Sequence, residues 1–234
     1  MQQAARSLRV PRKLQPSTCR LIHNHPPNIS GRTTSFGFKT VPEESKESLV
    51  KSVFDSVASK YDLMNDASSL GVHRLWKDSL IDTLKPGRKG PLRCIDVAGG
   101  TGDIALRILD HARENYADRE TTVEIVDINA QMLKEGFTRF KKTMYHNSEL
   151  YSAYDVLNLI IPSAPQVSFH EANAQELPPS QFKDDSYDLY TIAFGIRNCT
   201  SIPAVLREAY RVLKPGATFA CLEFSKVNNP LLNT

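Results

Sequence analysis

The chain has 234 residues, of which 41% are hydrophobic and 24% are charged. This balance is typical of a folded domain with a buried core and excludes a fibrous or wholly disordered chain. No apolar run approaches the roughly 20 residues that a membrane-spanning helix needs, so we do not expect an integral membrane protein. The four cysteines lie far apart without a CxxC pair, which argues against a disulfide scaffold or a structural zinc site.

The net charge of +3 is unevenly distributed along the chain. Residues 1–42 contain seven Lys and Arg and no Asp or Glu, so the remainder holds 22 basic and all 26 acidic side chains. An acid-free, arginine-rich start with Ser and Thr is typical of a mitochondrial transit peptide, and we assign residues 1–35 to such a leader or to a disordered basic tail. Because the remaining part is acidic, we expect no nucleic-acid partner.

Beyond the leader, hydrophobic spacing predicts helices between residues 43 and 84, ended by a Lys-Pro-Gly sequence. Strands and helices then alternate. The predicted strands are residues 92–98, 122–127, 167–171, 187–194 and 218–224. The predicted helices among them are residues 103–115, 130–142 and 202–213. Such alternation indicates an α/β fold with a doubly wound, mostly parallel sheet, formed by residues 91–234. Residues 36–90 form an N-terminal helical extension, and residues 143–165 are an insertion of unknown role.

A glycine-rich turn follows the first of these strands, in the sequence CIDVAGGTGD at 94–103. Gly99, Gly100, Thr101 and Gly102 stand where the next helix must begin, so the backbone can approach a ligand closely and present helix N-terminal amides to it. Asp127 ends the second strand, where a carboxylate can accept two ribose hydroxyls. The pattern favours a nucleoside cofactor. The alternative is that the glycines are needed only for the packing of this turn and that no ligand binds there.

Two nucleoside cofactors use this geometry. A nicotinamide dinucleotide prefers GxGxxG, whereas this chain has Asp96 shortly before the turn, where a carboxylate would repel pyrophosphate. The same carboxylate could bind the ammonium group of S-adenosyl-L-methionine, so we favour a methyltransferase over a dehydrogenase. Asn173 and Ala174 follow the third strand and could bind the amino edge of adenine, although an Asn there is often only a turn residue.

Three stretches carry a family resemblance. They are YDLMN at 61–65 with Ser69, His73 and Trp76, DVAGGTGD at 96–103 with DIN at 127–129 and NA at 173–174, and FGIRN at 194–198 with RVLKPG at 211–216 and EFS at 223–225. Together they resemble the ubiquinone/menaquinone biosynthesis C-methyltransferase family over about residues 36–232. The first and third stretches are more specific than the glycine turn.

The resemblance implies a class I S-adenosylmethionine-dependent methyltransferase with a Rossmann-like core, in which residues 36–90 form a lid. It implies methylation of a ring carbon of a 2-methoxy-6-polyprenyl-1,4-benzoquinol in ubiquinone biosynthesis. The leader points to the mitochondrial branch, and the lipid substrate to peripheral association with the matrix side of the inner membrane. A multi-protein biosynthesis complex and a homodimer are the further partners considered. The expected cofactor-binding residues are Asp96, Gly99, Gly100, Thr101, Gly102, Asp127, Asn173 and Ala174, with no metal ligand.

Arg197 and Asn198 are the expected catalytic residues, together with Tyr61. An arginine stays protonated, so Arg197 is expected to stabilise a phenolate and orient a water that removes the proton, with Asn198 holding the same water or hydroxyl. The alternative for Arg197 is a salt bridge at the sheet edge. Tyr61 is expected to close over cofactor or substrate, or else to be a core aromatic.

The resemblance also implies that family members continue beyond Thr234 with a last antiparallel hairpin. We therefore expect a chain truncated at its C-terminus, as a shortened gene product or an incomplete gene model, with the apolar edge of its last strand unpaired. An alternative function follows from this expectation. The chain would then be a catalytically impaired protein that binds S-adenosylmethionine, or an assembly component of a quinone-synthesis complex.

Overall fold

The structure is a computed structural model that describes residues 6–9, 33–36, 39–57, 69, 71–145 and 165–224. Tyr61 and most of the expected insertion, residues 146–164, lie outside the described residues. None of the helices in the described part is long and apolar enough to cross a membrane.

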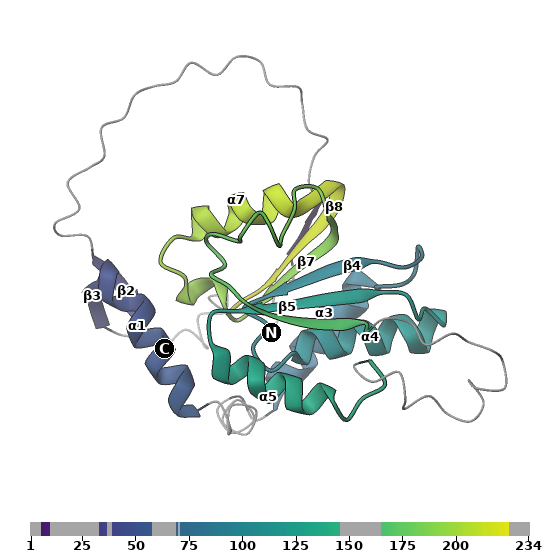
Figure 1. Ribbon diagram of the computed structural model, residues 1–234, viewed down its shortest axis with the longest axis horizontal. Coiled ribbons are helices and arrows are strands. Elements are labelled where there is room, and N and C mark those ends of the chain that lie inside the picture. Colours follow the sequence, from purple (N-terminus) through teal and green to yellow (C-terminus); the bar gives the residue numbers. More distant parts are fainter. Residues whose placement is uncertain are drawn as a thin grey trace, which may run out of the picture.

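A six-stranded sheet forms the centre of the molecule, with the spatial order β1-β8-β7-β4-β5-β6 (Figure 1). Its strands are β1 (Arg6–Arg9), β4 (Arg93–Val97), β5 (Thr122–Asp127), β6 (Val167–Glu171), β7 (Tyr187–Ala193) and β8 (Leu213–Leu222). The five strands from β4 to β8 run parallel to one another. The chain fills the sheet outward from β4 to β6 and then returns to β7, so β4 and β7 flank the point where the strand order reverses. In such sheets ligands bind at the carboxyl ends of the strands at this point.

Helices cover both faces of the sheet, which confirms the predicted doubly wound α/β fold (Figure 1). The helices of the first face are α3 (Val72–Leu84), α4 (Asp103–Tyr116) and α5 (Ala130–Phe140), and that of the second face is α7 (Ile202–Val212). Side chains of β4 alternate between two buried apolar clusters: Cys94 belongs to the first, whereas Ile95 and Val97 belong to the second. This continuous burial of β4 is the reason why its sequence shows no alternation of polar residues.

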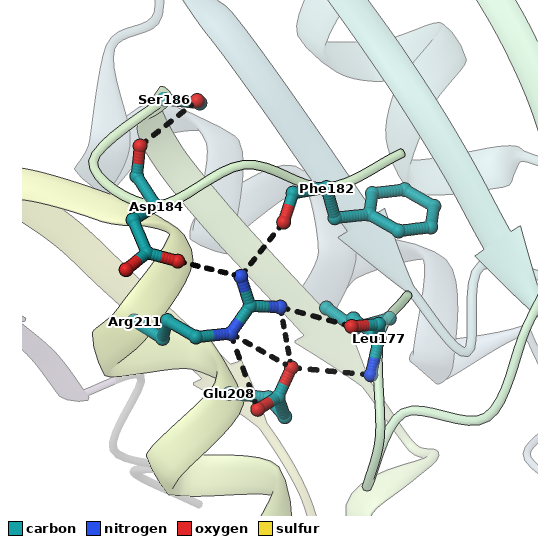
Figure 2. A network of polar contacts seen from close by, with 6 residues as sticks. All are labelled: Leu177, Phe182, Asp184, Ser186, Glu208 and Arg211. Atoms are coloured by element: carbon teal, nitrogen blue, oxygen red, sulfur yellow. Dashed lines mark hydrogen bonds and ion pairs between the residues drawn. The ribbon is translucent and has the colours of Figure 1, made fainter. Parts of the chain in front are cut away.

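The second face is completed by the β6–β7 connection, residues 172–186, in which no helix forms. Leu177 and Phe182 from this connection are fully buried against α7. The Arg211 guanidinium holds the segment by donating to the carbonyls of Leu177 and Phe182 and to the carboxylates of Asp184 and Glu208 (Figure 2). The Glu208 carboxylate also accepts the N–H of Leu177. One side chain of α7 thereby replaces the backbone hydrogen bonds that a helix would supply.

The described part before residue 72 differs from the expectation of a purely helical extension. A hairpin of β2 (Thr33–Phe36) and β3 (Lys39–Pro42) precedes α1 (Glu43–Val57). Figure 1 shows α1 beside one end of the sheet. Helix α3 follows and packs on α4. The predicted helical pattern from residue 43 therefore holds for both α1 and α3.

Three expectations about this edge of the sheet were wrong. Residues 6–9, placed in a transit peptide or a disordered leader and not in the sheet, form β1, and β1 pairs antiparallel with β8 from Arg6 opposite Cys221 to Arg9 opposite Thr218. The edge of β8 that we expected to be unpaired is therefore covered in the structure. Strand β8 also begins at Leu213 and not at residue 218. A bulge opposite Tyr187 and Leu189 accommodates the extra residues, among them Gly216 with φ of 82°.

Candidate active site

A pocket lies at the carboxyl ends of β4, β5, β6 and β7, where the sheet topology predicts a ligand site. The turn after each of these strands contributes to its wall, and α1 and α3 add Val50 and Lys77. The expected residues that line it are Asp96, Gly99, Gly100, Thr101, Asp127, Asn173, Ala174 and Asn198. Gly102 and Arg197 do not contribute to this wall in the described part.

The glycine turn needs glycine because neighbouring groups approach its backbone closely. A Cβ added at Gly99 would lie 2.8 Å from the Asp96 carbonyl oxygen, and one at Gly102 would lie 2.7 Å from a Phe140 ring carbon. Gly102 also has a φ of 78°, which strains other residues. Gly102 thus serves close packing of α4 on α5 and β5, whereas Gly99 brings the backbone to the pocket.

Asp127 is fixed in the pocket wall by two backbone amides. Its Oδ2 accepts the N–H of Gly100 at 2.9 Å, and its Oδ1 accepts the N–H of Asn129 at 2.8 Å. Burial raises the pKa of Asp127, although these backbone hydrogen bonds act in the opposite direction. Each carboxylate oxygen can accept a further hydrogen bond. The arrangement suits a pair of ribose hydroxyls.

Asp96 is fully buried at the end of β4, and its two oxygens differ. Oδ1 accepts a hydrogen bond of 2.7 Å from the Thr191 hydroxyl on β7, whereas Oδ2 has no hydrogen-bond partner within the described part of the chain. Burial raises the pKa of Asp96 to about 7, against the opposing effects of the Thr191 hydrogen bond, the Lys77 charge and the nearby Ala105 backbone N–H, which comes too far from ideal geometry to satisfy Oδ2. A buried acceptor without a partner is costly. An ammonium donor from a bound ligand would satisfy it.

Asn173 lies in the pocket wall, but its side-chain oxygen is already used. Oδ1 accepts the backbone N–H of Gln175 at 2.9 Å, so Asn173 closes a turn as the alternative interpretation expected. Gln175 in turn accepts hydrogen bonds from the Thr200 hydroxyl and the Ser201 N–H. The loop after β6 is thus tied to the loop after β7. Ala172 and Ala174 give this part of the wall an apolar surface for a purine.

Arg197 and Asn198 lie on η3 (Ile196–Asn198), the turn that follows β7. Asn198 lines the pocket, whereas the half-exposed Arg197 guanidinium lies 3.3 Å from the Glu223 carboxylate and 4.5 Å from the centre of the Phe224 ring. The alternative that we considered for Arg197, an ion pair at the end of the sheet, is the arrangement in the structure. Phe224 also packs against Phe194 and Trp76, with ring centroids 4.9 and 5.7 Å away.

Sequence reasoning missed two lysines from the N-terminal helices. The Lys46 ammonium of α1 is buried and donates to the carbonyls of Arg197 and Cys199, both at 3.1 Å. The Lys77 ammonium of α3 lines the pocket and donates to Asp103 at 2.7 Å. One feature of the sequence could have indicated that Lys77 is buried: it lies four residues after His73 and three before Leu80, on the apolar side of α3. Nothing in the sequence indicated the partners of Lys46.

A family model described as the ubiE/COQ5 methyltransferase family matches residues 40–234. The chain belongs to this family. It is 55% identical over 201 residues to a Schizosaccharomyces pombe protein named 2-methoxy-6-polyprenyl-1,4-benzoquinol methylase, mitochondrial, and the match covers 86% of this chain and 60% of that protein. It is 50% identical over 207 residues to the ubiquinone/menaquinone biosynthesis C-methyltransferase of Rhodopseudomonas palustris, covering 88% of this chain and 72% of that protein.

The structural comparison agrees with the fold. A solved structure titled as a SAM dependent methyltransferase from Aquifex aeolicus has a TM-score of 0.50 and 19% identity, and covers 74% of this chain and 76% of that chain. The ubiE/COQ5 assignment confirms the resemblance found in the sequence motifs and the expected cofactor, S-adenosyl-L-methionine. The chain spans about 60% of the length of the S. pombe relative.

The pocket fits that cofactor in three respects. Asp127 offers fixed acceptors for a ribose. The unpartnered Oδ2 of Asp96 offers an acceptor for an ammonium group. The turn at Gly99 leaves no side chain between these two carboxylates and the pocket. A dinucleotide would instead bring pyrophosphate beside Asp96, and the charge repulsion argues against it.

Proposed function

We propose that the chain catalyses S-adenosylmethionine-dependent C-methylation of a 2-methoxy-6-polyprenyl-1,4-benzoquinol in ubiquinone biosynthesis. The observation that carries the proposal is the placement of Asp96, Asp127 and Asn198 around one pocket at the point where the strand order reverses. Family membership and the names of the relatives support the reaction and the substrate class.

The cofactor is held by residues of three turns in this proposal. Asp127 accepts the ribose hydroxyls, Asp96 accepts the ammonium group, and the wall at Ala174 packs on the purine. Bound S-adenosylmethionine supplies an electrophilic methyl group, which bonds to the ring carbon as the carbon–sulfur bond breaks and sulfur keeps the electron pair. The fixed contacts at both ends align the acceptor and donor atoms, which is the main requirement of such a displacement.

Asn198 and Arg197 act on the substrate ring. Asn198 lines the pocket and orients the quinol hydroxyl or a water beside it. Arg197 stabilises the phenolate form of the ring, which makes the ring carbon nucleophilic, and the proton that the ring loses passes to water. In this role the guanidinium exchanges its Glu223 contact for the substrate oxygen. Tyr61, outside the described residues, completes the proposed set by closing over the ring.

The proposed location is the mitochondrion, peripheral to the matrix side of the inner membrane. The acid-free, arginine-rich composition of residues 1–35 supports import, and the S. pombe, Dictyostelium discoideum and Danio rerio relatives carry the word mitochondrial in their names. The lipid substrate supports contact with a membrane surface. The proposal also includes association of this chain with other proteins of quinone synthesis or with a second copy of itself.

Two measurements on the full chain test the function. Calorimetry should show binding of S-adenosylhomocysteine and no binding of NAD. Anaerobic incubation with S-adenosylmethionine and the reduced methoxy-quinol should add one methyl group, detected by mass spectrometry. Binding without methyl transfer would favour the cofactor-binding protein over the enzyme, and binding of NAD alone would refute both.

Arg197→Met tests the catalytic assignment. It should lower kcat by about 100-fold or more, because charge stabilisation in the transition state is lost, and it should leave the affinity for the cofactor within a few-fold of wild type. Arg207→Met is the matched control, because Arg207 is exposed on α7. Equal activity of the two variants would remove Arg197 from the mechanism.

A further inference from the structure

Helix α3 brings one buried cation to the pocket. The Lys77 side chain is 8% exposed, and its Nζ lies 2.7 Å from Oδ2 of Asp103, the first residue of α4. Both side chains line the pocket. A buried ammonium is costly unless its donors are satisfied, so a lysine at this place calls for an explanation.

The ion pair with Asp103 does not by itself explain why the Lys77 ammonium is buried at the pocket. An ammonium group has three donors, and its hydrogen bond to Asp103 uses one of them. Asp103 is also close to Arg107 and Arg139, at 3.6 and 3.5 Å. Burial alone would raise the pKa of Asp103, but these three cations together hold it below its usual value. The carboxylate therefore has other cations near it, and within the described part of the chain the Lys77 ammonium uses one of its three donors.

The position of Lys77 indicates what those donors meet. Asp96 of β4, Asp127 of β5 and Asn173 after β6 line the pocket at the carboxyl ends of the strands. Lys77 and Asp103 line the part of its wall where α3 packs on α4. The charge of Lys77 acts on Asp96 as well. In a nucleoside with its ribose at Asp127 and its ammonium group at Asp96 Oδ2, the carboxylate is bonded to the same carbon atom as the ammonium group, so it lies in the part of the pocket that Lys77 and Asp96 both line.

We propose that Lys77 binds the α-carboxylate of the cofactor and makes the site specific for a ligand that carries it. This inference rests on the proposed use of S-adenosylmethionine. Asp96 then binds the ammonium group and Lys77 the carboxylate, so the two ends of the zwitterion meet opposite charges from two different elements, β4 and α3. Because Lys77 belongs to the N-terminal extension, cofactor binding adds a further contact between α3 and the core.

Decarboxylated S-adenosylmethionine tests the proposal, because it keeps the ammonium and sulfonium groups and lacks only the carboxylate. The full wild-type chain should bind S-adenosylmethionine about 10- to 100-fold more tightly than the decarboxylated ligand, the range of a charge-assisted hydrogen bond. At about pH 8, above the pKa of Asp96, which the Lys77 charge also lowers, Lys77→Met should weaken S-adenosylmethionine by a similar factor and change the decarboxylated ligand by less than about threefold. Calorimetry gives all four affinities, and thermal unfolding shows that the variant is folded.

A double variant separates direct contact from charge balance. Lys77→Met leaves Asp103 with one cation fewer, and that carboxylate could itself repel the ligand's carboxylate. Lys77→Met with Asp103→Asn removes both charges, and the proposal predicts that the preference for S-adenosylmethionine stays lost. If the double variant regains the preference, or if Lys77→Met never loses it, Lys77 serves only to join α3 to α4. A wild-type chain that binds neither ligand would instead overturn the proposed function.

Discussion

A Cβ added at Gly195 would lie 2.4 Å from the Cβ of Ala98, so the turn after β7 and the turn after β4 touch each other with no space between them. Both turns line the pocket, and each contains a residue in the left-handed region, Ala98 with φ of 53° and Phe194 with φ of 57°. Such backbone is costly for residues other than glycine and persists where the surroundings hold it. The contact between the turns therefore fixes the position of two neighbouring parts of the pocket wall.

Gly195→Ala should therefore impair both folding and binding. The added methyl group has to displace the Ala98 turn, and we expect a loss of about 1–3 kcal/mol in the free energy of unfolding, with weaker binding of S-adenosylhomocysteine. Urea denaturation and calorimetry measure the two effects. Adding Ala98→Gly removes the methyl group that clashes and should restore binding, whereas a double variant as impaired as Gly195→Ala would contradict the explanation. Gly195 has a φ of −108°, so alanine adds no backbone strain.

The sequence was sufficient to predict the core of the sheet and the place of the pocket. Strands that alternate with helices must be parallel, and parallel strands bring their carboxyl ends to one edge, so Asp96, Asp127 and Asn173 were expected to meet there. The packing of the N-terminal helices depends on distant contacts, such as those of Lys46 with residues 197 and 199. No local pattern encodes these contacts, nor the pairing of β1 with β8.

The direction of the Arg197 side chain was likewise beyond sequence reasoning. The motif places Arg197 directly after β7, so the residue lies at the edge of the sheet where the carboxyl ends of the parallel strands meet. Its contacts with Glu223 and Phe224 depend on where β8 ends. The motif indicated a functional position, whereas the orientation of its side chain required the packed structure.

The raised pKa of Asp96 predicts opposite pH trends for stability and for binding. Between pH 4 and 7 the folded chain keeps a proton on Asp96 that the unfolded chain has lost, because burial raises the pKa from 3.8 to about 7. This group therefore makes the free energy of unfolding fall as pH rises through that range. Binding of an ammonium group needs the ionised carboxylate, so affinity for S-adenosylmethionine should rise with pH by up to about tenfold per unit and level off above about pH 7.

Asp96→Asn should flatten both trends, because the amide does not titrate and can still accept the Thr191 hydrogen bond. Urea denaturation and calorimetry at several pH values between 5 and 8 measure the slopes. An affinity profile that keeps its wild-type slope in the variant would assign the pH dependence to another group.

Lys46 joins α1 to the turn that carries the expected catalytic residues. Lys46→Met leaves the carbonyls of Arg197 and Cys199 without this donor, which should cost about 1–3 kcal/mol. Helix α1 also supplies Val50 to the pocket wall, so its loosening should speed the dissociation of S-adenosylhomocysteine, measured by stopped-flow fluorescence. Lys134→Met is the control, since Lys134 is exposed on α5. Equal dissociation rates for the two variants would show that α1 is held to the pocket by other contacts.

Arg211 offers a test of how the loop after β6 is held (Figure 2). Its guanidinium donates to two carbonyls and two carboxylates. A planar group with five donors can satisfy these four acceptors at once. Lysine cannot reproduce that geometry, so Arg211→Lys should lower the free energy of unfolding by about 2–3 kcal/mol. Lys214→Met is a matched control, because Lys214 makes one half-exposed ion pair with Asp188 and its loss should cost at most about 1 kcal/mol.

The loop that Arg211 holds also carries Asn173 and Ala174, so Arg211→Lys should also weaken the binding of S-adenosylhomocysteine in calorimetry. Lost stability with unchanged affinity would mean that the Gln175 contacts with Thr200 and Ser201 hold the cofactor end of the loop by themselves.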